Sequence, residues 1–365
     1  MMNIPKQKLI MIIVSIVAAV SVGGAVIYNV TKPEEKVEKT VEKTVNEHEG
    51  EMRSFLTGEW VDEEVGTKRP VAIMTENIPA AMPQYGLSKA GVIYECPMEG
   101  GLTRLMPIYE DYSGLDKIGN VRSCRPYFAY FAAEFDAIYV HYGQSRYAEP
   151  LLNNGLVNNI SGLDGAVNKS FFRSNDRKAP HNAYTSEEGI KSGIEKKGYN
   201  DTYAEDFTGH YKFADENSLN TLSDGSACEV VKLYYPSNKP SFVYDKESKT
   251  YKRYQYNDAQ KDAVNDAQLE VTNIILQNVT GGTYDCPEGY LDLNVSGSGS
   301  GKFITQGKII DITWTKGEDG ITHYYDLNNN EIQLNPGKTW VSVIQEQSAD
   351  KNVFYDTVEN YEASK

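Results

Sequence analysis

Two glutamates, Glu95 and Glu99, are the residues of this 365-residue chain whose type and spacing best suit catalysis. They lie four positions apart in the run YECPMEGG, so a regular strand, in which side chains alternate, would point both to one side. The apolar neighbours of Glu95 favour a raised carboxyl pKa, which would leave it a proton to donate as a general acid. A structural role is the alternative, because three arginines follow that could pair with either carboxylate: Arg104, Arg122 and Arg125.

Polar residues that could bind a substrate follow these glutamates. Arg122 and Arg125 directly precede a predicted helix, where guanidinium groups and the helix dipole favour an anion such as a carboxylate or a phosphate. His141 and Tyr142 end a predicted strand, a common place for sites in mixed sheets, although a satisfied core histidine is the competing interpretation. The loop at 176–182 is dense in polar residues and better suited to binding than to packing. The predicted substrate-binding residues are Arg104, Arg122, Arg125, His141, Tyr142, Asp176, Lys178, His181 and Asn182.

Other kinds of chemistry are disfavoured by the same sequence. There is no G-x-S-x-G motif, and the run GSGSGK at 297–302 lacks residues that a phosphate-binding loop needs, so we expect a bent hairpin there. The four cysteines form no C-x-x-C pair, which argues against zinc, while free thiols and one or two disulfides both stay open. The net charge of −15 would repel phosphate backbones and disfavours nucleic-acid binding. We therefore predict no metal and no cofactor, and the 26 tyrosines suit wet, polar, stacking surfaces.

The elements that must position these residues mix strands and helices. Apolar runs predict a buried strand at 69–75 and two more strands on either side of Glu99. Pro126 opens a helix of aromatic and alanine residues, which leads into a strand ending at 141–143. The pair Thr185 and Glu188 forms a capping box for a helix that ends at Gly198. Residues 56–220 are therefore predicted to form a mixed α/β domain that carries any active site.

Beyond residue 225 the pattern changes to short alternating segments separated by turn residues. This pattern is typical of antiparallel sheets and predicts a β-rich C-terminal domain over 225–350. The polar stretch at 215–226 is the expected joint. The predicted fold class is α+β, with a mixed N-terminal domain followed by an antiparallel β-rich domain.

The N-terminal segment predicts attachment to a membrane. Residues 9–28 carry no charge and are long enough to span a bilayer as a helix. Lys6 and Lys8 precede them, so residues 1–8 are expected in the cytoplasm and the bulk of the chain outside the cell. A cleaved signal peptide is the alternative, although no A-x-A-like cleavage site is obvious. Residues 29–55 are charged and are expected to form a stalk.

Four segments of the N-terminal half carry a family resemblance. The runs RPVAIMTENIPAAMPQYGLSKAGVIYECPMEGGLTR, KIGNVRSCRPYF, YVHYG and FRSNDRKAPHNAYTS resemble the YerB-like family of cell-surface lipoproteins of Gram-positive bacteria. The later ITWTK and YYDLNNNEIQLNPGKTWV resemble the C-terminal domain of that family, so the resemblance covers about residues 68–345. Many relatives carry a lipid-modified cysteine after the signal, which this chain lacks, so an anchor helix is expected in its place. The run QYNDAQ also lacks a histidine expected in that region.

The resemblance implies an envelope role and two domains, but no reaction. A stalked, acidic, tyrosine-rich extracellular domain with one protected glutamate suggests a wall polymer as substrate, and peptidoglycan glycan strands are the leading choice. A lytic transglycosylase needs a single glutamate that acts first as acid and then as base, whereas a conventional hydrolase needs two carboxylates. The sequence therefore favours glycan cleavage of the transglycosylase type. The alternatives are a non-catalytic peptidoglycan-binding or scaffold module, with Glu95 and Glu99 in structural ion pairs, or a protein that assists envelope protein partners.

Overall fold

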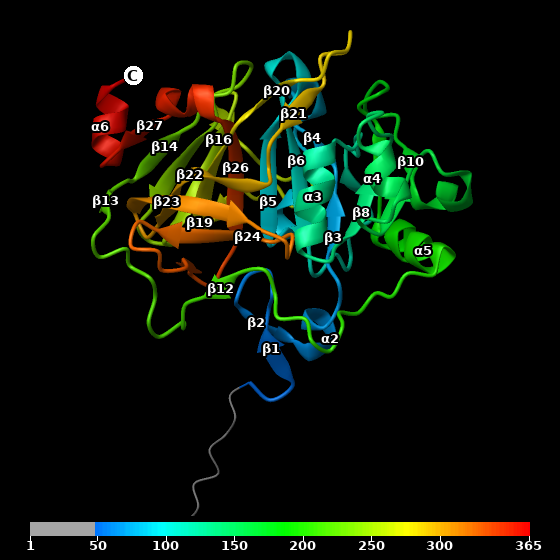
Figure 1. Ribbon diagram of the computed structural model, residues 1–365, viewed down its shortest axis with the longest axis horizontal. Coiled ribbons are helices and arrows are strands. Elements are labelled where there is room, and N and C mark those ends of the chain that lie inside the picture. The colour runs from blue at the N-terminus through cyan, green and yellow to red at the C-terminus, as the bar shows by residue number, and fades with distance from the viewer. Residues whose placement is uncertain (1–47) are drawn as a thin grey trace, which may run out of the picture. The chain divides into compact units, whose positions relative to one another are not determined.

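A mixed central sheet runs through both halves of the chain (Figure 1). The structure is a computed structural model, which describes residues 48–365. In this range the sheet has twelve strands, in the order β13 (Ser226–Ala227), β23 (Lys308–Lys316), β22 (Gly297–Thr305), β19 (Asn273–Val279), β26 (Thr339–Gln345), β5 (Val92–Pro97), β6 (Thr103–Tyr109), β3 (Val71–Ile73), β8 (Ile138–His141) and β9 (Asn159–Ser161), with β24 (Thr322–Asp326) beside β23 and β4 (Thr75–Glu76) beside β6.

The two halves meet at the pairing of β26 with β5. These strands are parallel, with Thr339 opposite Val92 and Ser342 opposite Glu95, and β26 is also parallel to β19. The prediction of a purely antiparallel C-terminal sheet is therefore wrong at β26, although the other pairs in that half are mostly antiparallel. Strand β26 is central and buried on both faces, the setting in which parallel pairing is most common.

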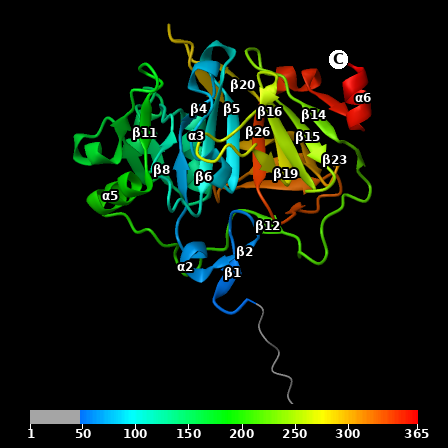
Figure 2. The same cartoon turned by 180° about the vertical axis from the view of Figure 1, so that it is seen from behind.

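A second sheet covers one face of the central sheet (Figure 2). It contains β17 (Asp258–Ala259), β16 (Thr250–Gln255), β15 (Ser241–Asp245), β14 (Val230–Lys232) and β27 (Val353–Tyr355), with β18 (Glu270–Val271) beside β16. Between the sheets, Phe242 of β15 packs edge-on against Trp340 of β26, with ring centroids 5.5 Å apart. Because Ile93 of β5 joins the same buried cluster, this core is shared by both halves.

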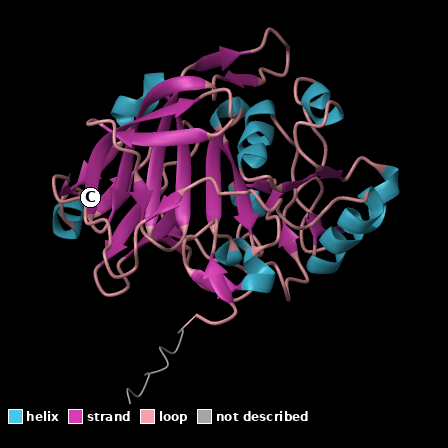
Figure 3. Cartoon of the chain, turned by 60° about the horizontal axis from the view of Figure 1, so that its bottom comes forward, coloured by secondary structure: helices cyan, strands magenta, loops and turns pink. Residues whose placement is uncertain are grey.

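Helices and smaller strand pairs lie mostly around the margins of these sheets (Figure 3). The helices are α2 (Glu63–Gly66), α3 (Pro126–Glu134), α4 (Glu149–Asn153), α5 (Glu187–Lys197) and α6 (Val358–Ala363), with short 3₁₀ turns at Pro79–Ala81, Leu87–Lys89, Glu99–Gly101, Gly165–Ser170 and Glu346–Lys351. The small pairs are β1 (Glu51–Arg53) with β2 (Trp60–Asp62), β10 (Phe172–Arg173) with β11 (Ala183–Thr185) and β7 (Ile118–Gly119), β12 (Lys212–Phe213) with β25 (Gln333–Leu334), and β20 (Gly281–Thr283) with β21 (Leu291–Leu293).

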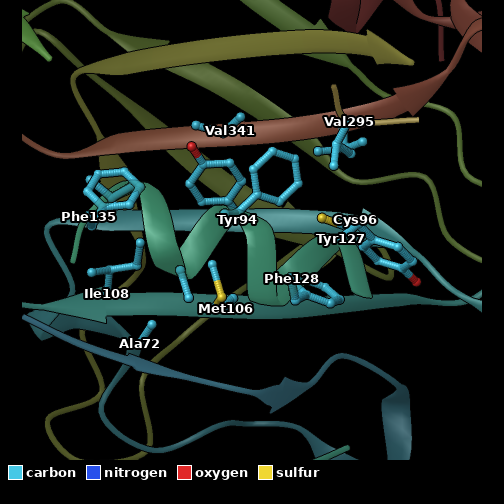
Figure 4. Packing of buried hydrophobic residues seen from close by; sticks show 14 of the residues in the cluster. Ala72, Tyr94, Cys96, Met106, Ile108, Tyr127, Phe128, Phe135, Val295 and Val341 are labelled. Carbon is cyan, nitrogen blue, oxygen red and sulfur yellow. The ribbon is translucent and has the colours of Figure 1, made fainter. Parts of the chain in front are cut away.

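Helix α3 covers the other face of β5 and β6 (Figure 4). Tyr94 and Cys96 point from β5 toward this helix, whereas Ile93, the residue before Tyr94, points to the second sheet. The ring of Tyr94 stacks on Phe131 of α3 at 4.5 Å. Strand β5 is buried throughout and, apart from Glu95, carries no charge, because both of its faces are covered and side chains of alternate residues supply the two cores.

Buried polar side chains also join the two halves. Glu134, at the end of α3, accepts hydrogen bonds from Lys316 at 2.7 Å and from the backbone and hydroxyl of Thr322, and it lies 3.0 Å from His210. Asp262 accepts hydrogen bonds from Gly86 and Ser88 across more than 170 positions. Such satisfied clusters fix the relative position of the elements that carry them, because separating them would leave buried charges unpaired.

Most predicted elements are confirmed, with local corrections. The strands around Glu99, helix α3 and the strand that ends at His141 are all present. The capping box is wrong by one residue: Ser186, not Thr185, accepts the hydrogen bond from Gly189 at the start of α5. Glu51–Arg53, assigned above to the stalk, forms strand β1. The GSGSGK run lies along β22 of the β22–β23 hairpin.

The predicted anchor at 9–28 lies outside the described residues. Among residues 48–365, no helix combines the length and the apolar character needed to cross a bilayer.

Candidate functional site

Glu95 lies at the junction of the two sheets and is fully buried. One carboxylate oxygen accepts hydrogen bonds from Thr103 at 2.9 Å and Asn77 at 3.1 Å, and the other accepts one from Arg253 at 2.8 Å. Arg253 comes from β16, is 1% exposed, and places its guanidinium 3.9 Å from the ring centre of Trp340. Burial lowers the pKa of Arg253, and the charge of Glu95 partly offsets that effect. This is the geometry of a structural ion pair, although its partner is none of the three arginines expected.

Glu99 does not share a face with Glu95. Strand β5 ends at Pro97, and Glu99 lies in the following turn, where its two oxygens accept hydrogen bonds from Arg125 at 2.9 and 3.0 Å. The Glu99 and Arg125 side chains are 18% and 10% exposed. Although burial opposes it, the hydrogen bonds and charge of Glu99 raise the pKa of Arg125 above its usual value. The expectation that both glutamates face one side is wrong, because the strand stops between them.

The structure brings together three arginines that the sequence analysis singled out, here called the arginine cluster: Arg104, Arg122 and Arg125. Arg104 on β6 donates to the backbone oxygen of Ser123 at 2.6 Å, and Arg125 is the residue immediately before α3. Arg122 lies 2.6 Å from Glu76 of β4, which also lies 3.5 Å from His181. Burial lowers the pKa of Arg104 to about 10. The charge of Glu76 opposes this shift, whereas the charges of Arg125 and Arg122 add to it.

The polar loop at 176–182 lies beside this cluster. The backbone oxygen of Pro180 accepts a hydrogen bond from Arg122, and Asp176 accepts one from Lys117 at 2.8 Å. Although desolvation opposes it, Lys117 lowers the pKa of Asp176 to about 2. Asn182 donates to the backbone oxygen of Ser174 and accepts from Arg173, both just before the loop, while Lys178 is exposed. In this loop Pro180 therefore contacts the cluster directly, and His181 contacts Glu76, the partner of Arg122.

His141 is not part of this surface. It is fully buried, with its ring nitrogens 2.9 Å from the backbone oxygen of Gly143 and 3.2 Å from the side-chain oxygen of Asn159. Burial lowers the pKa of His141, which is the behaviour of a satisfied core histidine. The ring of Tyr142 faces Arg173 of β10, whose guanidinium lies 5.0 Å from the ring centre. Strand β10 pairs with β11.

Three tyrosines form a further surface next to Arg125, here called the tyrosine platform: Tyr147, Tyr284 and Tyr290. Tyr147 and Tyr284 stack at 3.7 Å with an interplanar angle of 8°, and Tyr290 meets Tyr147 edge-on at 6.1 Å. Arg125 lies 4.8 Å from the ring centre of Tyr290. Tyr284 and Tyr290 lie in the hairpin of β20 and β21, which packs beside α3 at one end of the central sheet (Figure 1).

Comparison with known proteins places the chain in a family. Residues 56–200 match the model described as "Protein of unknown function (DUF3048) N-terminal domain", and residues 231–341 match the corresponding C-terminal domain. The chain is 31% identical over 304 residues to "Putative lipoprotein YerB" of Bacillus subtilis (strain 168), a match that covers 82% of this chain and 88% of that protein. This chain belongs to the YerB-like family. The crystal structure of YerB from Bacillus subtilis resembles it with a TM-score of 0.73 at 28% identity, over 83% of this chain and 99% of that one.

Several residues at the site of this YerB-like chain were not predicted from the sequence. Glu76 directly follows the strand predicted at 69–75, and a charged residue in that position is a signal that could have been used. Arg253 and the hairpin tyrosines come from the C-terminal half, from which no site residue was predicted. All four cysteines in the described range are free, and three of them are buried. Because the family domains are described as of unknown function, the function has to be inferred from this site.

Proposed function

We propose that this member of the YerB-like family is a membrane-associated protein of the cell surface that binds peptidoglycan without cleaving it. The observation that carries the proposal is the tyrosine platform, a group of aromatic rings beside a paired arginine. Tyrosine offers an apolar face for sugar rings and a hydroxyl for their polar groups, which suits a hydrated polysaccharide. The predicted anchor at 9–28 would hold this surface near the wall. The Bacillus subtilis relative is named as a lipoprotein, and in this chain the anchor would serve in place of the lipid.

Binding is favoured over cleavage because of how the two candidate acids are held. A glycosidic oxygen is protonated by a carboxylic acid that reaches it, typically within hydrogen-bond distance. Glu95 is fully buried and bonded to Arg253, and its other hydrogen-bond partners, Thr103 and Asn77, are buried as well. Glu99 is partly exposed, but both of its oxygens are engaged by Arg125. An adjacent arginine favours the charged carboxylate, which has no proton to donate.

Transglycosylase activity would therefore fall to Glu99, the less buried of the two candidate acids. That reaction requires Glu99 to exchange its bond with Arg125 for one with the substrate. Glycan cleavage by Glu99 is therefore the alternative outcome of the binding experiment with sacculi.

The proposal is tested by sedimentation of the full-length protein with purified sacculi. Wild-type protein should sediment with the sacculi, which should stay unchanged by mass analysis of their soluble products. Tyr284→Ala and Tyr147→Ala each remove one ring of the stacked pair, and each should weaken binding several-fold, in line with the ~0.5–1.5 kcal/mol of an aromatic contact.

The matched control is Tyr361→Ala, which removes one ring of another surface pair, that of Tyr355 and Tyr361 at 5.3 Å. This variant should bind like wild type. Failure of the wild-type protein to sediment with sacculi would end the binding proposal. Release of products with anhydromuramyl ends, abolished by Glu99→Gln, would replace it with the transglycosylase reaction.

A further inference from the structure

The arginine cluster carries more positive charge than its partners neutralise. Arg122 pairs with Glu76 and Arg125 pairs with Glu99, but among residues 48–365 Arg104 makes no ion pair with a carboxylate. Three guanidinium groups thus face two carboxylates in a chain whose net charge is −15. A local excess of one positive charge is unexpected in so acidic a chain unless something anionic balances it.

Arg104 is the member of the cluster that most needs a partner. Its side chain belongs to a residue that is 6% exposed, and its Nε is buried with no hydrogen-bond partner in the described range. Its one side-chain hydrogen bond, from Nη1 to the backbone oxygen of Ser123, leaves the guanidinium without a carboxylate of its own, because the nearby Glu76 contacts Arg122. A buried cation is costly unless it is both paired and hydrogen-bonded. The structure therefore holds a donor for which the chain itself supplies no acceptor.

The surroundings of Arg104 are suited to an oxyanion. Arg125 immediately precedes α3, a nine-residue helix whose N-terminus carries partial positive charge. Arg122 of the cluster is 20% exposed in its side chain, and His181, which shares Glu76 with it, is 24% exposed, so a ligand can reach these groups from solvent. Planar guanidinium forks match the two oxygens of a carboxylate, and such charge-assisted bonds are stronger than neutral ones. A ligand with a single negative charge would balance the excess.

We infer that Arg104, Arg122 and the N-terminal end of α3 bind a carboxylate of the peptidoglycan stem peptides. This inference rests on the proposed function, since Arg125 joins the cluster to the tyrosine platform through Tyr290. The platform would hold the glycan, and the cluster would hold the acidic peptide that branches from it. Binding of the polymer then depends on its carboxylates as well as on its sugar rings.

The test compares two preparations of sacculi, both stripped of phosphate-containing polymers. In one preparation the carboxyl groups are left free, and in the other they are amidated. The full-length wild-type protein should bind the amidated sacculi on the order of ten-fold more weakly, because a hydrogen bond to a charged group is lost. Arg104→Gln and Arg122→Gln should bind the free-carboxyl sacculi as weakly as wild type binds the amidated ones, and amidation should change their binding little.

Controls separate loss of the site from loss of the fold. Arg53→Gln removes a positive charge from β1, at the opposite end of the central sheet from β20 and β21 (Figure 1), and should leave binding unchanged. Arg122 is partly exposed, so its variant should fold even if the Arg104 variant does not, as circular dichroism will show. Equal binding of wild type to both preparations, or full binding by Arg122→Gln, would overturn the inference and leave the proposed function standing. No binding to either preparation would end the proposed function itself.

Discussion

Replacement of Glu95 by Gln tests whether this buried carboxylate is structural or functional. The substitution keeps the size of the side chain but removes its charge, so Arg253 is left 1% exposed without a counter-ion. The hydrogen bonds from Thr103 and Asn77 can persist to the amide oxygen. The perturbation is therefore confined to the ion pair between β5 and β16.

The expected cost follows from the burial of both partners. Removing one partner of a buried ion pair typically destabilises a protein by ~3–5 kcal/mol, because the remaining charge stays desolvated. The remaining partners of the Arg253 guanidinium are the neutral amides of Gln260 and Gln255, and its Nη1 has no hydrogen-bond partner in the described range, so no second carboxylate bonds to it. A loss of this size should lower the melting temperature by on the order of 10 °C.

Thermal melts and urea unfolding at pH 7 measure this loss directly. Glu99→Gln is the matched control, because its pair with Arg125 is more exposed and should contribute less. The double variant Glu95→Leu with Arg253→Met should recover part of the stability, since buried ion pairs are often replaceable by apolar residues. A Glu95→Gln protein that melts like wild type but no longer acts on sacculi would refute the structural reasoning and restore Glu95 as a catalytic acid.

Three further predictions concern pH, thiols and the membrane. Burial raises the pKa of Glu110 to about 7, only partly opposed by hydrogen bonds from Ser54 and Phe55, so the folded state holds this proton more tightly than the unfolded chain. The resulting contribution to the free energy of unfolding is full below pH ~4.5 and is lost as the pH rises through about 7. Urea unfolding should therefore show a free energy of unfolding that is lower at pH 8 than at pH 5 by up to about 3 kcal/mol. Glu110→Gln should abolish this difference. In the native protein a thiol reagent should modify Cys286 first, because burial raises the pKa of Cys124 and of Cys228 to about 12. Early labelling of Cys124 or Cys228 would contradict their burial. Deletion of residues 1–30 should move the protein from the membrane fraction to the soluble fraction, and retention in the membrane would disprove the predicted anchor.

Local features of this chain were predictable because they depend on neighbours in the sequence. The apolar run around Glu95 predicted a strand, and Pro126 marked the first turn of α3. The short alternating segments beyond residue 225 likewise identify the β-rich half. The grouping of Arg122 and Arg125 ahead of a helix was visible for the same reason. In each case the signal and the structure it produces lie within about ten residues.

The assignment of partners was decided only by the tertiary structure. Glu95 pairs with Arg253, which is 158 positions away, and Glu134 bonds Lys316 at a separation of 182. Nearer arginines were available to Glu95 in the sequence, but side chains of alternate residues leave a strand on opposite faces, and β5 presents Glu95 to the second sheet. The tyrosine platform likewise combines Tyr147 with two residues of a distant hairpin. The sequence thus determined which segments form strands and helices. The stacking of the two sheets determined which charged side chains meet, because a buried charge can pair only with groups on the face of the sheet that it shares.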